Sequence, residues 1–540
     1  MPTTPSMHYS SPRTMSSYHG SNGHQGTQGS DSDVLSYTSD EVANQGMLTD
    51  QVVGSGGNDM ASPKESKGTR KTTDLSSMIP QTVQSLSRWP VVMDSSPWAA
   101  YISQNSTPLT QTRTNDEGVT DGMEASAGST LSLKQCMALV ERYLETSNME
   151  NPILDPVRLR PLVSQAYLSN FRLSIESCLA LLVCANGAIS SPFGAEPGPE
   201  RTADYKLADK LYRFAEQRLG MAFTTGSVAG AQALYLSGVF HMCRLRAFEA
   251  WQMYHAALCA SQKFSFVTNA VTPCSVGPDN FSLEERIYWS SWKSEGELRW
   301  ELGLRDFDNR AINHPPFFPC PPDGQNDEQQ RSWFFYLSEI SLWRNHFGAE
   351  QELHRLAHEK NCNPLDELKL KFEDLEQQII DWQQSLAPPI QIGRLDADAG
   401  PEMDFLKYLL KTQAGNYYEL ITWPFISAAV RDGKHVDARV RALIAKGLGW
   451  HCQRLTIYTQ GFYHRHRGTW LMQRRSIRSA LLILAASLTP EIEDLLPYGW
   501  PEKIHAVVTM LLRWSAEICD ADQHAELLSS LLEKYMYEHQ

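Results

Sequence analysis

The sequence predicts an all-α protein, and three observations support this fold class. From residue 132 to the end, apolar residues recur at the spacing of three and four that places them on one face of a helix. Segments rich in proline and glycine separate the periodic stretches. No run of alternating apolar and polar residues indicates a strand, and no β-α-β unit is visible.

The first part of the chain differs in composition from the rest. Residues 1–130 are rich in Ser, Thr, Gly, Gln and Asn and contain no cysteine. They have too little apolar surface to offset the entropy lost on ordering, so this tail is predicted to be disordered. Residues 86–101 contain several aromatic side chains. They either dock onto the body or a partner, or form only a transient cluster, and the sequence leaves both readings open.

The remainder is predicted to be one large helical body with two halves. Residues 131–325 form the N-terminal half and residues 326–540 the C-terminal half, with a subdivision near a proline-rich segment at 315–322. Proline has a fixed φ and lacks an N–H group, so that segment is expected to be extended.

The N-terminal half is predicted to contain a series of helices. An amphipathic helix starts near Ser132, and residues 174–189 are apolar on most faces, which is typical of a buried helix. Another helix is expected over residues 203–219. Residues 227–264 are predicted to form a helical hairpin that turns at 244–246.

The next helix is predicted to begin with a capping box formed by Ser282 and Glu285. Glu295 and Arg299 are four residues apart in the favourable order, which supports a helix by about 0.2–0.5 kcal/mol. The helix is expected to end near Gly303.

The C-terminal half is also predicted to be helical throughout. Asn363-Pro364 has the pattern of an N-cap followed by a first-turn proline. The other helices expected here cover 326–360 (as one helix or two), 365–387, 403–430, 435–459, 470–488, a short one from Thr489-Pro490, 504–518 and 523–537.

Composition limits the function classes. The net charge is −14 and the pI is near 5.6, which argues against a protein that binds nucleic acid over its whole surface. Residues 1–30 lack the apolar core of a signal peptide, and the longest near-continuous apolar run, residues 480–488, is far shorter than a membrane span. We expect a soluble intracellular protein that does not bind membranes.

The ten cysteines do not form a C-x-x-C pair, the spacing that most zinc knuckles and redox pairs need. Most lie in apolar helical segments, so they are predicted to be buried free thiols in a reducing compartment. Their positions are 136, 178, 184, 243, 259, 274, 320, 362, 452 and 519.

Glu350, His354 and His358 share one helix face and form a candidate metal site. A straight helix does not easily place three ligands, one per turn, around one ion, and the glutamate of H-E-x-x-H is missing. We therefore interpret the three as a solvated polar stripe and predict no metal ligand.

The most basic stretch contains His464, Arg465, His466 and Arg467, followed by three arginines at 474, 475 and 478. One interpretation is a phosphate or nucleic-acid contact with aromatic side chains nearby for stacking. The favoured interpretation is that these arginines pair internally with carboxylates and fix helix packing.

A weaker basic patch in the tail consists of Lys64, Lys67, Arg70 and Lys71, and either a nuclear-import signal or a phosphate contact would account for it.

Catalytic motifs are missing from the sequence. It has no G-x-S-x-G, no Walker loop, no Rossmann fingerprint and no aspartate-rich metal motif of the helical isoprenoid enzymes. We predict that the chain is not an enzyme, and we assign no catalytic and no cofactor-binding residue.

Several segments in order resemble the regulatory region of fungal zinc-cluster transcription factors. Examples are KSEGELRWELGL followed by FFPCPP, and RHRGTWLMQRRSIRSALLILAA in the C-terminal half. The matching segments are residues 228–264, 282–322, 332–342, 417–425, 463–486 and 496–504. The resemblance implies a nuclear transcription regulator of a metabolic or secondary-metabolite gene set. Its helical body would receive a small-molecule effector or a partner and so control activation.

The sequence departs from that family at one point. Family members usually begin with a binuclear zinc cluster that contains two C-x-x-C pairs and places a helix in the DNA major groove. The first cysteine here, Cys136, is already in the helical body, so no zinc ligand, base contact or other cofactor is assigned. Nor does a heptad run precede residue 130, so the coiled-coil dimer of the family is not predicted, and the oligomeric state stays open.

Three alternatives remain at this point. The natural protein could be longer and carry the zinc cluster upstream, so that it binds DNA directly. It could be a coregulator that reaches DNA through another DNA-binding regulator or the transcription machinery. It could be an enzyme or a metabolite-binding protein on the same fold, and a buried pocket with convergent polar groups and a perturbed titratable residue would favour this third alternative.

Overall fold

The structure is a computed structural model of the 540-residue chain. It describes residues 78–104, 130–193, 203–264, 267, 281–304, 318–319, 321, 325–359, 363–393, 402–432 and 436–539. Every regular element in these ranges is a helix, and none of them contains a strand, so the all-α prediction is confirmed. The described residues, from 78 to 539, belong to one compact unit.

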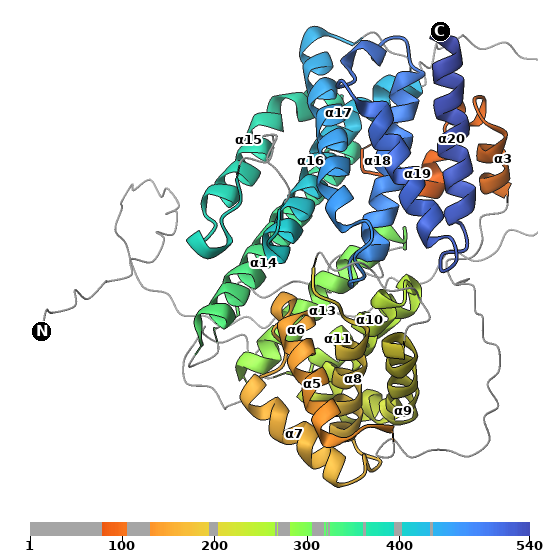
Figure 1. Ribbon diagram of the computed structural model, residues 1–540. Coiled ribbons are helices and arrows are strands. Elements are labelled where there is room, and N and C mark those ends of the chain that lie inside the picture. Colours follow the sequence, from red (N-terminus) through yellow and green to blue (C-terminus); the bar gives the residue numbers. More distant parts are fainter. Residues whose placement is uncertain are drawn as a thin grey trace, which may run out of the picture. The chain divides into compact units, whose positions relative to one another are not determined.

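A helix that is buried along nearly its whole length organises the N-terminal half. This is α8 (Ile175–Ile189), in which every residue from Ser177 onwards is buried. It contacts α5 (Leu133–Glu145), α7 (Pro156–Leu168), α9 (Ala203–Thr225) and α10 (Val228–Cys243), as Figure 1 shows. The sequence of α8 is apolar on most faces because other helices pack against it on several sides.

The remaining helices of this half lie next to α10. The predicted hairpin is confirmed, because α10 packs along α11 (Ala247–Ser261), and Leu245 between them has a φ of 59°. Helix α11 packs against α13 (Phe281–Glu301), and the short α6 (Ser147–Glu150) follows α5.

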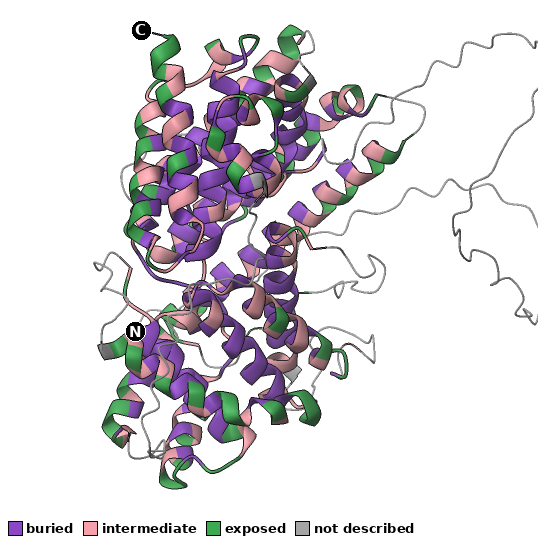
Figure 2. Ribbon diagram, turned by 90° about the vertical axis from the view of Figure 1, so that its right-hand side faces the viewer, coloured by how far each residue is buried: buried purple, intermediate pink, exposed green. Residues whose placement is uncertain are grey.

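A second buried helix organises the C-terminal half. All residues of α18 (Thr469–Ser487) except Arg474 are buried. It contacts α16 (Phe405–Asp432), α17 (Ala438–Tyr458), α19 (Trp500–Trp514) and α20 (Ala521–Glu538). Figure 2 shows both buried cores as purple ribbon with exposed residues at the outside.

Helix α14 links the two halves. It spans Asp327–His358 without a break, so the segment expected as one helix or two is one. It contacts α6 and α13 of the N-terminal half, and α15 (Pro364–Gln384) and α16 of the C-terminal half. Three short 3-10 turns complete the described elements: η2 (Pro388–Ile390), η3 (Thr459–Gly461) and η4 (Glu493–Leu495).

Local sequence signals explain several helix ends. Ser132 forms a capping box with Gln135, and Asn363 accepts a hydrogen bond from the N–H of Leu365 with Pro364 in the first turn. After α13, the N–H of Leu304 donates to the Arg299 carbonyl across Gly303, whose φ is +64°. This is a Schellman turn, which favours glycine because a left-handed residue with a Cβ is strained.

Two predicted helix starts are shifted. Helix α13 already includes Phe281, so Ser282 lies in its first turn and is not the N-cap that was predicted. The short helix expected from Thr489-Pro490 is instead a turn followed by η4.

The structure corrects part of the predicted disordered tail. Residues 78–104 lie within the predicted tail 1–130, yet they form α1 (Val83–Leu86), α2 (Pro90–Met93) and α3 (Pro97–Gln104). We call residues 78–104 the docked segment, because these helices contact α18, α16 and α20 respectively. Of the two readings left open for residues 86–101, docking on the body is confirmed.

Specific side chains hold the docked segment in place. The rings of Trp89 and Trp423 lie 5.6 Å apart, and Lys534 Nζ donates to the Ser95 hydroxyl at 2.9 Å. Aromatic burial of this kind offsets the entropy lost when the segment becomes ordered. The average composition of residues 1–130 is polar, so it does not indicate this local burial. Residues 1–77 and 105–129 lie outside the described residues, so their predicted disorder stays a prediction.

Within the described part of the chain, no helix has a stretch both long enough and apolar enough to cross a bilayer.

Candidate functional site: a pocket beside buried ion pairs

The basic stretch of residues 462–478 lies in the interior, where its arginines pair with carboxylates. Arg475 and Arg478 of α18 pair with Glu297 and Glu301, which are four residues apart on α13. The other arginines pair as follows: Arg465 with Glu517, Arg467 with Glu150, and Arg474 with Asp520. The interpretation of internal pairing is confirmed, and these buried side chains do not form a surface for nucleic acid.

Arg478 belongs to a buried chain of charges that joins four helices. Its Nε donates to Glu419 of α16 at 2.7 Å, and Arg454 of α17 approaches the same carboxylate at 2.8 Å. Burial alone would raise the pKa of Glu419, but the charges of Arg454 and Arg478 outweigh this effect and hold it well below its usual range. Glu419 is therefore ionised, and its charge is compensated within the protein.

A second buried group of charges crosses between the two halves. Lys293 of α13 pairs with Glu339 of α14, and both side chains are fully buried. Arg467 approaches Glu339 at 3.4 Å and also pairs with Glu150 of α6. Breaking a buried pair of this kind leaves an uncompensated charge, so the group fixes the relative positions of its elements.

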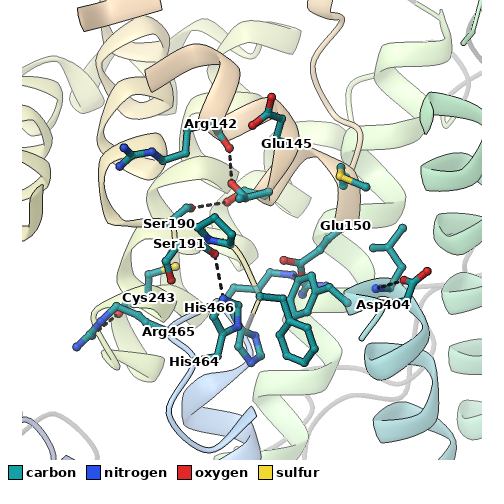
Figure 3. Close-up of a pocket in the computed structure, with 18 of the residues that line it drawn as sticks. Arg142, Glu145, Glu150, Ser190, Ser191, Cys243, Asp404, His464, Arg465 and His466 are labelled. Atoms are coloured by element: carbon teal, nitrogen blue, oxygen red, sulfur yellow. Dashed lines mark hydrogen bonds and ion pairs between the residues drawn. The ribbon is translucent and has the colours of Figure 1, made fainter. Parts of the chain in front are cut away.

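A pocket of about 680 Å³ lies directly beside this second group. Its walls come from both halves: the segment from α5 to α6, the segment after α8, the beginning of α16 and the loop before α18 (Figure 3). Its apolar lining is formed by Met149, Pro192, Phe193, Met403, Phe405 and Leu406. A pocket of this size and mixed lining is typical of small-molecule sites.

The charged groups around the pocket balance. The guanidinium groups belong to Arg142, Arg331, Arg465 and Arg467, and the carboxylates to Glu145, Glu150, Glu402 and Asp404. Most of these groups are held in ion pairs, for example Arg331 with Asp404, and Glu402 with Lys411 at 2.8 Å. The pocket therefore offers no excess charge of either sign.

Two histidines form the floor of the pocket. His464 and His466 lie side by side in Figure 3, with ring centroids 5.2 Å apart and planes 24° apart. Burial lowers the pKa of both imidazoles, and for His466 the neighbouring His464 and Arg467 lower it further. Both rings are therefore neutral at pH 7. The edges of Phe193 and Phe405 pack against His464 at 5.3 and 5.4 Å.

His466 also lines a small cavity of about 30 Å³ behind the pocket, next to Arg467 and Arg475. The floor of the pocket is thus in contact with the side chains that carry the buried ion pairs.

A second pocket of about 610 Å³ lies between the docked segment and the body. Its lining includes Arg88 and Trp89 of the docked segment, Trp300 of α13, and Glu350 and His354 of α14. The docked segment therefore forms one wall of this second pocket.

The three candidate metal residues lie on α14, where Glu350 and His354 are half-buried and His358 is exposed. His354 Nε2 lies 3.8 Å from Glu350 Oε1, and Nδ1 of His358 bonds to the backbone carbonyl of His354. Across the described ranges, no group of three or more His, Cys, Asp or Glu side chains has a geometry that could hold a metal ion.

The described cysteines are free thiols, and most are buried as predicted. Cys136, Cys178, Cys184, Cys243 and Cys452 are buried, Cys519 is half-buried and Cys259 is exposed. The cysteines at 274, 320 and 362, the basic patch from Lys64 to Lys71 and most of the proline-rich segment lie outside the described residues.

Sequence reasoning did not find the pocket. It singled out His464 and His466 only as parts of a basic stretch, and it gave no role to Ser191 and Phe193. The positions 191 and 464 are joined only by the tertiary fold, so no spacing rule connects them. The one available signal was the alternation of histidine and arginine over residues 464–467, where charge repulsion favours a neutral ring at His466.

Comparison of the chain with models of known protein families, with curated proteins and with solved structures gives no match.

Proposed function

We propose that this chain is a nuclear transcription regulator whose helical body binds a small-molecule effector in the pocket at the junction of the two halves. The observation that carries the proposal is the position of the pocket. Both halves contribute to its walls, and Glu150 and Arg467 in its wall belong to the buried ion pairs that join those halves. A ligand there contacts both halves at once and biases their arrangement, as an effector must.

The regulatory part of the proposal rests on the ordered resemblance of six segments to fungal zinc-cluster regulators. The pocket adds to it, because a regulatory body needs a place where a signal binds. It also fits the third alternative, a metabolite-binding protein, since convergent polar groups and perturbed histidines line it.

A specific observation favours the alternative in which the chain reaches DNA through another protein. The arginines of residues 465–478 are buried or half-buried and paired with carboxylates, so this basic stretch does not offer a phosphate-binding surface. A DNA-blind coregulator that acts through a partner factor is therefore the second candidate function. The patch from Lys64 to Lys71 is the remaining basic segment for direct binding.

Two experiments test these proposals. In the first, the full chain is fused to an unrelated DNA-binding module and tested on a reporter gene. We expect expression to differ from that with the module alone, and equal expression would contradict the regulatory role.

In the second, the purified full chain is mixed with pooled genomic DNA fragments at low and at moderate salt, with zinc present. We expect either that no DNA is retained, or that moderate salt abolishes the retention of every sequence. Sequence-selective retention at moderate salt would instead show direct DNA reading.

A further inference from the structure

The hydrogen bonds of the two pocket histidines fix their tautomers. The backbone N–H of Gly468 donates to Nδ1 of His466 at 2.9 Å, so the proton of this neutral ring is on Nε2. Nε2 of His464 donates to the backbone carbonyl of Ser191 at 3.0 Å, so Nδ1 of His464 is a bare acceptor. The floor of the pocket therefore holds one donor and one acceptor on adjacent rings.

Neither of these atoms has a hydrogen-bond partner among the residues that the structure describes. Both Nε2 of His466 and Nδ1 of His464 are buried and lack a hydrogen bond to any described residue. The two side chains belong to residues that are only 8% and 5% exposed. A buried polar atom without a hydrogen-bond partner destabilises the folded protein. Two such atoms side by side indicate a place built for a ligand that satisfies both.

The surroundings restrict the chemistry of that ligand. The charged groups of the pocket balance, and most are held in ion pairs with each other or with side chains outside the lining, so a net charge on the ligand gains nothing there. The rings of Phe193 and Phe405 are half-buried and pack edge-on against His464. Because both nitrogens are buried, a ligand reaches them only after neighbouring side chains move, and a flat apolar ligand then packs against these two rings.

We propose that the pocket binds an uncharged, flat molecule with a carbonyl group and an adjacent N–H, the pattern of a lactam or a cis-amide. The carbonyl accepts from Nε2–H of His466, and the N–H donates to Nδ1 of His464. This inference rests on the proposed effector pocket and specifies the chemical class of its ligand. A rival explanation is that water in the 30 Å³ cavity satisfies His466 alone.

The test uses 2-quinolone, which carries the lactam pattern on a flat apolar ring system, and N-methyl-2-quinolone, which lacks the N–H. Binding of both to the purified full-length chain is measured by titration calorimetry. We expect 2-quinolone to bind about 10-fold more tightly, because one hydrogen bond to a buried acceptor is lost on methylation. Equal affinities, or no binding of either compound at millimolar concentration, would overturn the proposal.

Two variants remove the effect of the added methyl bulk. In His464→Phe the acceptor is gone, so 2-quinolone and N-methyl-2-quinolone are expected to bind with about equal affinity. His505→Phe makes the same substitution at an exposed position of α19 outside the pocket lining, so it is the matched control and keeps the preference. An unchanged preference in His464→Phe would contradict the inference.

The two proposals fail in different ways. If the quinolones do not discriminate but the reporter fusion still changes expression, the ligand class is wrong and the regulatory role stands. If the quinolones bind as expected but the fusion is inert, the pocket is a ligand site of a protein that does not regulate transcription.

Discussion

At the scale of single residues, the charged side chains of the interior are held by partners from other helices. Arg478 is the largest charged side chain that is fully buried, and it bridges Glu301 and Glu419. Replacing a whole buried pair by apolar groups is often neutral, whereas removing one partner leaves a charge uncompensated. This difference makes the network testable by single substitutions.

We expect Arg478→Met to lower the free energy of unfolding by about 3–5 kcal/mol, because Glu301 and Glu419 lose a partner inside the protein. Arg439→Met is the matched control. Arg439 pairs with Glu373 at 3.1 Å on the exposed surface, so we expect a loss of at most about 1 kcal/mol. Urea denaturation of both variants measures the difference, and equal losses would show that the buried network is not a stability determinant.

Buried histidines predict how stability depends on pH. Burial lowers the pKa of His451 to about 3 and that of His346 to about 4. The unfolded chain takes up protons on these rings near pH 6.5, whereas the folded chain does not until pH 4 or lower. The unfolded state therefore binds more protons between these values, and the free energy of unfolding falls as the pH falls.

For each of the two rings, the free energy of unfolding is expected to fall by about 1.4 kcal/mol for each unit that the pH falls between pH 6 and pH 4.5. Urea denaturation at pH 7, 6 and 5 measures it. His451→Gln removes the contribution of one ring and is expected to make the pH dependence shallower by that amount. Identical pH dependence in the wild type and in His451→Gln would refute this assignment.

At the scale of elements, close helix packing depends on particular glycines. A Cβ on Gly187 of α8 would lie 2.1 Å from the carbonyl oxygen of Leu139 in α5. Backbone atoms cannot move aside as the end of a flexible side chain can, so this contact fixes the separation of the two helices. Gly220 of α9 has no atom within 4 Å of the same position.

These two glycines give a matched pair of substitutions. Gly220→Ala is expected to stabilise the protein by about 0.5–1 kcal/mol, because alanine is the better helix former and nothing obstructs it. Gly187→Ala gains the same propensity but forces α5 away from α8, so we expect a net loss of about 1–3 kcal/mol. Thermal unfolding of both variants decides the point, and a stabilising Gly187→Ala would contradict the described packing.

The docked segment is the element that composition concealed. Trp89 is buried against Trp423 of α16, whereas Tyr101, in the same segment, is 45% exposed. We expect Trp89→Ala to destabilise the protein by about 3–5 kcal/mol and to open residues 78–104 to limited proteolysis. Tyr101→Ala serves as the control with a loss of at most about 1 kcal/mol. Unchanged proteolysis in Trp89→Ala would show that docking does not depend on this contact.

At the scale of the whole molecule, the sequence predicted the fold better than the site. Helix ends at Ser132 and Asn363 follow local rules, and the apolar runs of α8 and α18 identify the buried helices, because these signals act over a few residues. The internal pairing of the arginines was also predictable, because an acidic chain supplies carboxylates for a short basic stretch.

The pocket was not predictable, because it depends on contacts between residues far apart in the chain. His464 bonds to Ser191, 273 positions away, and Arg467 pairs with Glu150 across 317 positions. Such contacts follow from how the two halves pack, and local periodicity does not encode them. The docking of residues 78–104 has the same cause, because it depends on contacts with α16, α18 and α20 that the polar composition of the tail as a whole does not indicate.

The central claim is that this pocket is where an effector acts on a regulatory body, and a pocket-filling variant tests it most directly. Reporter expression is measured for the fused full chain as wild type, as Ser190→Trp, which fills the pocket, and as Thr224→Trp, which places the same bulk on the exposed end of α9. Thermal unfolding of the three proteins confirms that each is folded.

We predict that Ser190→Trp changes expression while Thr224→Trp behaves as the wild type. A folded Ser190→Trp variant with wild-type expression would contradict the claim.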